Sequence, residues 1–407
     1  RDFNDLNQKL NLRLTGSISS DDGHVSGISK DDRLMFIENL ARMRQISLES
    51  QWHDSDDVVG WFELERFANG LRLFKNDRLL IDYTDMLQLF LDRGRAPKLD
   101  VMFVDEAQDL SPLQWAVVRK LCESADRIYI AGDDDQAIYR WAGADVDYLI
   151  RNSKDAMVLK QSYRIPKSIH TLAERCIGQV ASRVQKTWNP RKEAGHVSWE
   201  KSYESIDMES GDWLVLARTN YLLNGIEEHC RSEGWFYKTK NRNSVSEKKV
   251  KAVRDWETLR KGGEILLVDL IKVLNYMRVS VPTSLERNDF DSNISFEEAQ
   301  SYLPDLKQEY WYDLFDGISV SERSYIRAML RRGEKITKEP RIKLSTIHAA
   351  KGGEAENVIL LTDISNRIYK SYQANPDDES RVFYVGLTRA KQNLFLIEPQ
   401  TQKYFQI

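Results

Sequence analysis

Hydrophobic and polar positions follow a helical period in the first ninety residues of the chain. Apolar residues recur there every three to four positions, and this spacing predicts amphipathic helices. Three segments have the pattern: 31–46, 55–74 and 83–92. Thr84 or Asp85 can cap the third of them. The stretch 16–32 is rich in glycine, serine and aspartate, so it predicts a loop.

From residue 100 onward, short apolar runs alternate with helical patterns. Strands are predicted within 100–106, 127–136, 157–164, 213–220, 343–363 and 381–399, and helices within 111–123, 168–180, 222–234 and the first part of 381–399. Strands that alternate with helices are typical of a parallel α/β sheet. The first run, Val101 to Val104, predicts a strand buried on both faces.

The α/β pattern occurs in two blocks, 76–245 and 336–407. The stretch 246–335 between them is charged and helical and has no strand signals. We interpret it as an insertion. Its edges carry basic residues that either grip duplex phosphates or are solvated linker charges. They are Lys238, Lys240, Arg242, Lys248, Lys249 and Lys251 on one side, and Arg331, Arg332, Lys335, Lys338, Arg341 and Lys343 on the other.

Composition narrows the class of protein only moderately. A chain of 407 residues is long for one core and predicts two or more domains. The formal net charge of -4 gives no global basic signature, although a neutral protein can carry a local positive groove. The three cysteines are widely spaced and form no CxxC pattern, which argues against a zinc or disulfide framework and favours a reducing compartment.

Targeting signals are not evident in the sequence. There is no apolar run of transmembrane length and no signal peptide, so we expect no membrane partner and a cytoplasmic location. The chain begins with Arg1, and targeting at the true N-terminus is therefore left open.

Carboxylates follow the first predicted strand directly. Asp105 and Glu106 end the run, and charge at the end of a buried strand needs a metal ion, a basic group or solvent beside it. At the carboxyl edge of a parallel sheet, an Asp can hold Mg²⁺ and a Glu can orient an attacking water. The alternative is a solvated pair beside a helix cap at Asp109 or Ser111, and for an isolated Asp-Glu pair this alternative is favoured.

A second acidic strand end strengthens the first interpretation. The segment 128–144 runs apolar into Gly132, three aspartates and Gln136, and the Gln136 amide could sense a phosphate or a water. Tyr139 and Trp141 flank an arginine, an arrangement that suits stacking on the bases of a single strand. Burial of Trp141 in a core is an equally good interpretation.

Basic and glycine-rich stretches supply candidate phosphate ligands. Arg164 follows a predicted strand in "QSYR", and Arg389 lies in a predicted amphipathic helix in "YVGLTRAKQ". Arginine binds phosphate in a bidentate manner, but for each arginine alone a surface position or an ion pair is the favoured explanation. In "STIHAAKGGE" the two glycines let backbone N–H groups approach an anion. His348 in the same stretch is by itself readily explained as structural.

Together these stretches resemble, in order, the signature motifs of the superfamily 1 DNA helicases of the UvrD/Rep type. "VDEAQD" resembles motif II (the Walker B element), "GDDDQAIYRWAGA" motif III, "QSYR" motif IV, "TIHAAKGGEAENVIL" motif V and "YVGLTRAK" motif VI; "WLVLARTN" is similar to the strand that follows motif IV. The resemblance spans residues 101–391, and several of the motifs are near-verbatim.

The resemblance implies an α/β fold of two RecA-like parallel-sheet domains with helical insertions. The implied division is 1–75 helical insertion of the first lobe, 76–155 first RecA-like domain, 156–245 second RecA-like domain (first segment), 246–335 helical accessory insertion, and 336–407 second RecA-like domain (second segment). It also implies ATP and Mg²⁺ as cofactors, single-stranded DNA and single-strand/duplex junctions as partners, 3′ to 5′ movement and association with the nucleoid. It leaves open a role in repair, replication or recombination.

The resemblance also implies a role for each matching residue. Asp105 and Glu106 handle Mg²⁺ and the hydrolytic water, Gln136 senses the γ-phosphate, and Arg164 and Arg389 contact that phosphate from the second domain, with Arg389 as the arginine finger. Tyr163 stacks on adenine, Gly352 lies in the nucleotide-binding turn, and Glu354 meets the ribose. Tyr139 and Trp141 stack on DNA bases, and Thr346 and His348 contact the strand.

One family motif is absent from the sequence. No G-x-x-x-x-G-K-[ST] occurs in the 407 residues, so the loop that cradles phosphates is missing. We expect that the N-terminal part of the first RecA-like domain is not included, and a degenerate ATPase is the alternative. Two other functions stay open: a non-hydrolysing DNA-binding subunit, and a metal-dependent nuclease, for which the sequence lacks the expected E-x-K lysine.

Overall fold

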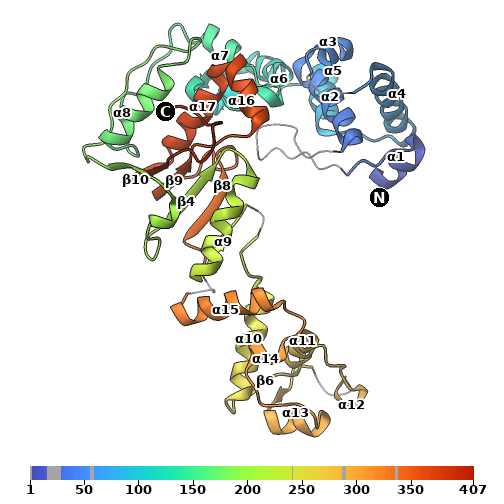
Figure 1. Ribbon diagram of the computed structural model, residues 1–407. Helices are drawn as coiled ribbons and strands as arrows, with labels where there is room; N and C mark the ends of the chain where they lie inside the picture. The colour runs from blue at the N-terminus through green and yellow to red at the C-terminus, as the bar shows by residue number, and fades with distance from the viewer. Residues whose placement is uncertain (1, 16–28, 56–58, 241, 287–289, 335–337) are drawn as a thin grey trace. The chain divides into compact units, whose positions relative to one another are not determined.

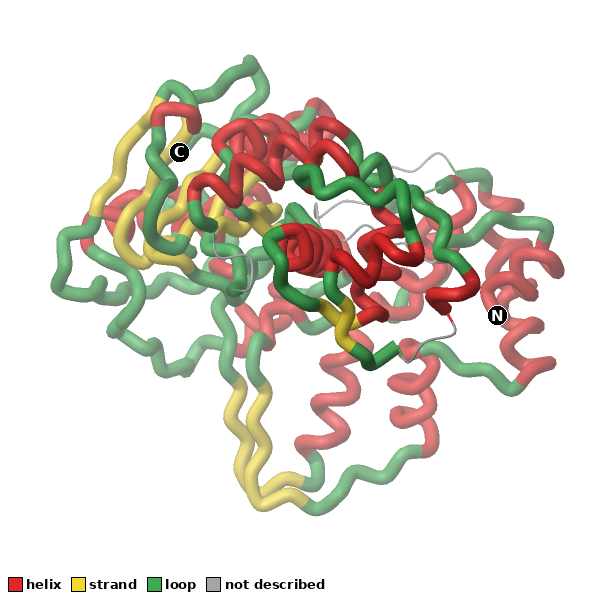
Figure 2. The backbone as a smooth tube through the Cα atoms, turned by 90° about the horizontal axis from the view of Figure 1, so that it is seen from below, coloured by secondary structure: helices red, strands yellow, loops and turns green. Residues whose placement is uncertain are grey.

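The computed structural model describes residues 2–15, 29–55, 59–240, 242–286, 290–334 and 338–407 (Figure 1). These residues form two compact units. Unit 1 comprises Arg1–Trp199, Leu216–Leu222 and Thr346–Ile407, and unit 2 comprises Glu200–Val215 and Leu223–Ser345. Most of the loop predicted at 16–32 lies outside the described residues. Helices alternate with strands that gather into sheets (Figure 2). Among the described helices, none has the length and apolar character that crossing a bilayer requires.

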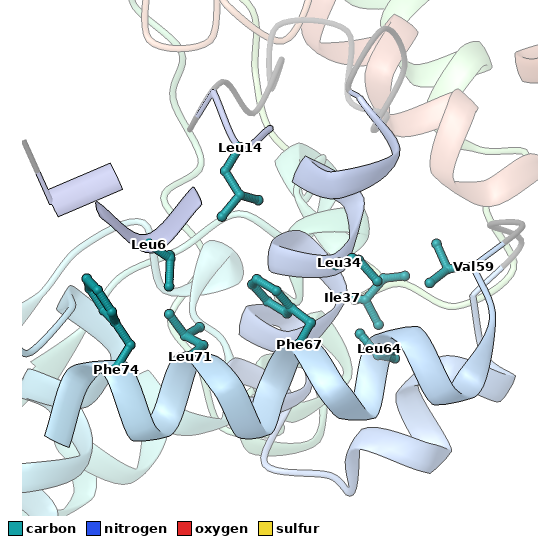
Figure 3. Packing of buried hydrophobic residues seen from close by; sticks show 9 residues of the cluster. All are labelled: Leu6, Leu14, Leu34, Ile37, Val59, Leu64, Phe67, Leu71 and Phe74. Carbon is teal, nitrogen blue, oxygen red and sulfur yellow. The ribbon is translucent and has the colours of Figure 1, made fainter. Parts of the chain in front are cut away.

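Unit 1 begins with a helical layer. Its helices are α1 (Asp2–Leu10), α2 (Lys30–Arg44), α3 (Leu48–His53), α4 (Trp61–Arg78) and α5 (Tyr83–Arg93). Leu64, Phe67, Leu71 and Phe74 recur at helical spacing on α4 and are buried against side chains of α1 and α2 (Figure 3). The prediction that Thr84 or Asp85 caps α5 is wrong. The cap is Asp82, whose carboxylate accepts the Asp85 N–H in a capping box.

The first α/β layer of unit 1 is a pair of parallel strands, β1 (Leu99–Val104) and β2 (Ala125–Ile130). They are joined through α6 (Pro112–Cys122) and followed by α7 (Val146–Asn152). The prediction that β1 is buried on both faces is wrong, because Phe103 is 76% exposed. Its ring stacks on Tyr129 of β2 with centroids 5.2 Å apart, and no other described strand pairs with this sheet.

The second α/β layer includes a six-stranded sheet with the strand order β3-β10-β9-β4-β8-β5. Its strands are β3 (His196–Glu200), β4 (Trp213–Ala217), β5 (Tyr237–Lys238), β8 (Ile342–Thr346), β9 (Ala355–Leu361) and β10 (Ala390–Ile397). β10 pairs in parallel with β9, and β5 pairs in parallel with β8. Its helices in unit 1 are α8 (Lys167–Ile177), α16 (Asn366–Ala374) and α17 (Pro376–Leu387). The predicted α/β class with parallel sheets is confirmed.

Two local predictions in this layer are wrong. The segment 157–164 forms no strand, and only an isolated bridge joins Gln161 to Asn189, because Met157 and Leu159 lie exposed rather than in the sheet. Arg389 does not lie in a helix. α17 ends at Leu387 with Thr388 as its C-cap, and Arg389 therefore occupies the turn into β10.

Unit 2 is mainly helical. Its helices are α9 (Asn224–Glu233), α10 (Glu247–Arg260), α11 (Leu267–Met277), α12 (Thr283–Glu286), α13 (Phe296–Tyr302), α14 (Trp311–Leu314) and α15 (Val320–Arg332). The prediction that 246–335 has no strands needs a small correction, since β6 (Ile265–Leu266) and β7 (Asn293–Ile294) form a short antiparallel pair. Trp256 of α10 is fully buried and packs edge-on against Phe296 of α13.

Candidate active site

The carboxyl end of β1 presents the two predicted carboxylates. Asp105 and Glu106 are both exposed, and an Asp105 oxygen accepts the Glu106 N–H at 2.8 Å. Glu106 has a positive φ of 52°, a conformation that costs energy for a residue with a side chain and that occurs often at functional sites. Gln108 donates to the Glu106 carboxylate at 2.6 Å. The cap of α6 is Ser111, in a capping box with Gln114, as the alternative interpretation expected, and the carboxylates of Asp105 and Glu106 themselves cap no helix among the described residues.

The end of β2 lies against the end of β1. The Asp133 N–H donates to the Gln108 side-chain oxygen at 3.0 Å, and the Gln136 amide donates to the Asp133 carboxylate at 2.6 Å. A Cβ at Gly132 would lie 2.8 Å from that Gln108 oxygen, so glycine permits the close approach of the two strand ends. The two acidic strand ends predicted from the sequence therefore form one continuous hydrogen-bonded edge.

Two basic side chains bind the three aspartates after β2. The Lys186 ammonium contacts Asp133 at 3.1 Å, Asp135 at 2.9 Å and also Asp134, and Arg183 donates to both Asp135 oxygens. Burial opposes the ammonium charge, but the surrounding aspartates outweigh it and raise the pKa of Lys186. The sequence interpretation missed both basic residues, because a loop after α8 carries no periodic signal that relates it to β2.

Lys351 joins the glycine-rich turn before β9 to the acidic edge. Its ammonium contacts Asp109, donates to the Gln136 carbonyl at 3.0 Å and lies 3.3 Å from Glu106. Burial raises the pKa of Asp109, and the ammonium of Lys351 acts in the opposite direction. The same ammonium lies 5.3 Å from the centre of the Tyr139 ring. The lysine before two glycines was visible in the sequence, but its partners were not.

Arg389 is buried, with only 1% of its surface exposed. Its guanidinium donates to the Gln136 side-chain oxygen at 3.3 Å, to the Gly353 carbonyl at 3.2 Å and to the Val385 carbonyl at 2.8 Å. No carboxylate of the described residues lies within ion-pair distance of it. Burial, and next the charge of Arg164, lower its pKa to about 10, so it remains a cation at neutral pH. A buried cation without a carboxylate suits a bound anion.

The remaining predicted nucleotide ligands lie around Glu354. Arg164 lies 3.6 Å from the Glu354 carboxylate, and Lys391 lies 2.9 Å from it. The hydrogen bond from Lys391 is the main cause that lowers the pKa of Glu354. Tyr163 is 87% exposed, which leaves its ring free to stack. Gly352 has a φ of 80°, and a Cβ there would meet no atom within 4 Å, so this turn is open on its outer side.

The predicted DNA ligands differ in exposure. Tyr139 and Trp141 are half-buried, and the Trp141 ring stacks on Phe36 of α2 with centroids 6.3 Å apart. Thr346 and His348 are buried, at 1% and 2% exposed. Trp141 and His348 line a pocket of about 820 Å³, together with Arg44 and Arg140 and the carboxylates that pair with them, Asp54 and Asp147. The structure therefore brings Trp141 and His348 to one pocket. The Tyr139 ring lies beside His348, with centroids 6.2 Å apart, and Thr346 lies in β8.

The described residues offer single carboxylates, rather than a cluster, as candidate metal ligands. Within the described part of the chain, no group of three or more His, Cys, Asp and Glu side chains has the geometry to hold a metal ion. Asp105 has no basic partner among those residues. An exposed carboxylate at a strand end fits Mg²⁺ that is held through water and shared with phosphate oxygens, as this ion prefers.

Comparison with known proteins defines the class to which this fold and site belong. Residues 38–157 match the model of the UvrD/REP helicase N-terminal domain, and residues 316–401 match that of the UvrD-like helicase C-terminal domain. Together the two matches cover about half of the chain. The chain belongs to the UvrD/Rep family of superfamily 1 helicases.

Several curated relatives carry helicase names. The chain is 22% identical to the probable DNA helicase II homolog of Rickettsia conorii, over 82% of this chain and 65% of that protein. It is 28% identical to the ATP-dependent DNA helicase PcrA of Bacillus subtilis, over 47% of this chain and 26% of that protein. For the ATP-dependent DNA helicase srs2 of Schizosaccharomyces pombe the identity is 24%, over 90% and 53%. The chain thus spans at most 65% of the length of these three relatives.

Proposed function

We propose that the chain forms the motor of an ATP-dependent translocase on single-stranded DNA, which moves 3′ to 5′ and unwinds duplexes at single-strand/duplex junctions. The observation that carries the proposal is the buried guanidinium of Arg389, which has no described carboxylate within ion-pair distance. It lies 3.3 Å from Gln136, on the same edge as Glu106. This cation provides a place for the γ-phosphate of a nucleotide.

The roles of the nucleotide ligands follow from this placement. Asp105 would hold Mg²⁺, which neutralises charge on the phosphates when it is bound. Glu106 would orient the attacking water, and Gln136 would sense the γ-phosphate through the amide that now contacts Arg389. Arg164 would leave Glu354 for the phosphate, and Glu354 would then accept from the ribose. Tyr163 would stack on the adenine with its exposed ring, beside the open turn at Gly352.

Lys351 offers a physical link between nucleotide and DNA. Its ammonium contacts the acidic edge and lies over the ring of Tyr139, and the Tyr139 hydroxyl donates to the His348 carbonyl at 3.1 Å. A phosphate that competes for this ammonium would change the electrostatic contact with Tyr139. In this proposal the nucleotide state thereby alters how Tyr139 and Trp141 stack on DNA bases. Thr346 and His348 would contact the same DNA strand.

Removal of the Trp141 ring is expected to weaken DNA binding. Base stacking on an aromatic side chain contributes about 1–3 kcal/mol per base, so Trp141→Ala should lower the affinity for a fluorescein-labelled oligo(dT) about tenfold, as measured by anisotropy. Trp199→Ala is the matched control, because Trp199 is an exposed tryptophan in β3. An equal affinity for the two variants would remove Trp141 from the DNA site.

A second candidate function is a DNA-binding subunit that does not hydrolyse ATP. It is favoured by one specific observation, that the 407 residues contain no G-x-x-x-x-G-K-[ST]. Release of inorganic phosphate from Mg·ATP, measured with and without oligo(dT), separates the two candidates. Release that oligo(dT) stimulates supports the motor. Intact DNA binding without any phosphate release supports the non-hydrolysing subunit.

A further inference from the structure

Unit 2 carries a stack of planar side chains that the family motifs do not include. The Arg260 guanidinium lies 4.2 Å from the Tyr310 ring centre, Tyr310 and Tyr312 stack with centroids 5.2 Å apart at 8°, and the Arg327 guanidinium lies 4.3 Å from the Tyr312 ring centre. The order is therefore cation, ring, ring, cation. Cation–π contacts of this kind fix the orientation of an arginine at a surface.

Arg327 belongs to a row of arginines along α15. Arg323, Arg327 and Arg331 follow one another at intervals of four residues, which places them on one side of the helix about 6 Å apart along its axis. The opposite side of α15 is buried through Tyr325 and its neighbours. Arg327 and Arg331 are the exposed part of this row, whereas the Arg323 side chain is only 16% exposed.

The arginines of the planar stack and of the α15 row differ in whether a carboxylate neutralises them. Arg260 pairs with Glu257 at 2.8 Å, and Arg323 pairs with Asp316 at 3.3 Å. Arg327 and Arg331 are exposed, and no carboxylate of the described residues lies within ion-pair distance of either. The unneutralised charge is thus concentrated at the Arg327 end, although the whole protein has a net charge of -4.

This chemistry selects a ligand that has both planar and anionic groups. An arginine that already rests on a ring loses little side-chain entropy when it binds a further partner. The outer face of its guanidinium can stack on a nucleobase, while its N–H groups and those of Arg331 can bind phosphates. A single strand exposes both groups at once, whereas a duplex hides its base faces.

We propose that Arg327, Arg331 and the Tyr310–Tyr312 stack form a second contact for single-stranded nucleic acid, located in unit 2. The strand places phosphates on the two arginines and a base against the open face of Arg327. This contact goes beyond the proposed motor site, because it uses no residue of that site and requires no nucleotide hydrolysis.

The test uses the double variant Arg327→Glu/Arg331→Glu and anisotropy of labelled oligo(dT) across a salt series. Affinity should fall about tenfold, and the slope of log affinity against log salt should become shallower by about 1.4, as expected for two lost phosphate contacts on a single strand. Arg254→Glu/Arg278→Glu is the charge-matched control, since both residues are exposed arginines of unit 2. Tyr312→Leu, which removes the ring without a change of charge, should also weaken binding.

Cross-linking locates the contact independently of the motor site. Oligonucleotides that contain 5-iododeoxyuridine should cross-link to the peptide with Tyr310 and Tyr312, and Trp141→Ala should not abolish that cross-link even if it weakens overall binding. An unchanged affinity and salt slope in the double variant, or cross-links confined to unit 1, would overturn the second contact and leave the motor proposal intact.

Discussion

Replacement of Arg389 by alanine in the intact protein should lower the DNA-stimulated rate of ATP hydrolysis by at least about a thousandfold, because an arginine that stabilises the transition-state charge of phosphoryl transfer contributes this much or more to kcat. The guanidinium is already buried beside Gln136, so its charge acts where solvent screens it poorly. The measurement is steady-state phosphate release in the presence of oligo(dT). The affinity for oligo(dT) should stay within about threefold of the unchanged protein.

Two companion variants make this result specific. Arg66→Ala removes an exposed arginine from α4 and should leave the hydrolysis rate unchanged. Arg389→Met keeps most of the apolar volume of the side chain, and it should be as inactive as Arg389→Ala if the lost charge is the cause. Normal turnover in either Arg389 variant would rule out the arginine-finger role.

Lys186→Met is expected to lower the free energy of unfolding by roughly 3 kcal/mol or more, the usual cost of removing one partner from a buried ion pair. The loss would leave Asp133, Asp134 and Asp135 close together, with Arg183 as the remaining side-chain cation within ion-pair distance among the described residues. Urea denaturation at pH 7 measures the effect. A base with a raised folded-state pKa stabilises the fold fully below its unfolded value near 10.5 and loses that effect as the pH rises through the folded-state pKa, so pH 7 reports the whole contribution.

Lys192→Met provides the control for this measurement. Lys192 is an exposed lysine close to Lys186 in the sequence, and its replacement should change the free energy of unfolding by less than about 0.5 kcal/mol. A similar small change for Lys186→Met would mean that the three aspartates do not depend on this ammonium.

The strand ends of the site could be predicted from the sequence because their signal is local. An apolar run that stops at Asp105 and Glu106, and another that stops at Gly132 and three aspartates, are sufficient to place carboxylates at the edge of a parallel sheet. The order of the motifs added Arg389 to the same site, and its side chain does reach Gln136. Their proposed roles in catalysis remain predictions.

Other features depend on tertiary contacts that no local pattern encodes. Lys186 and Arg183 reach the aspartates from a loop about fifty residues away. Phe103 was predicted to be buried because β1 is apolar, but its exposure depends on which strands flank the sheet. The segment 157–164 has the composition of a strand, yet strand formation needs a neighbour, and this segment makes only one bridge.

In the proposed motor, acidic strand ends and basic side chains from the later motifs meet around a nucleoside triphosphate. A crystal structure of the protein with a non-hydrolysable ATP analogue, Mg²⁺ and oligo(dT) tests this most directly. We expect guanidinium nitrogens of Arg389 and Arg164 to lie within hydrogen-bonding distance of the γ-phosphate, with Asp105 beside Mg²⁺. A γ-phosphate bound elsewhere, with Arg389 still on Gln136 and Arg164 still on Glu354, would contradict it.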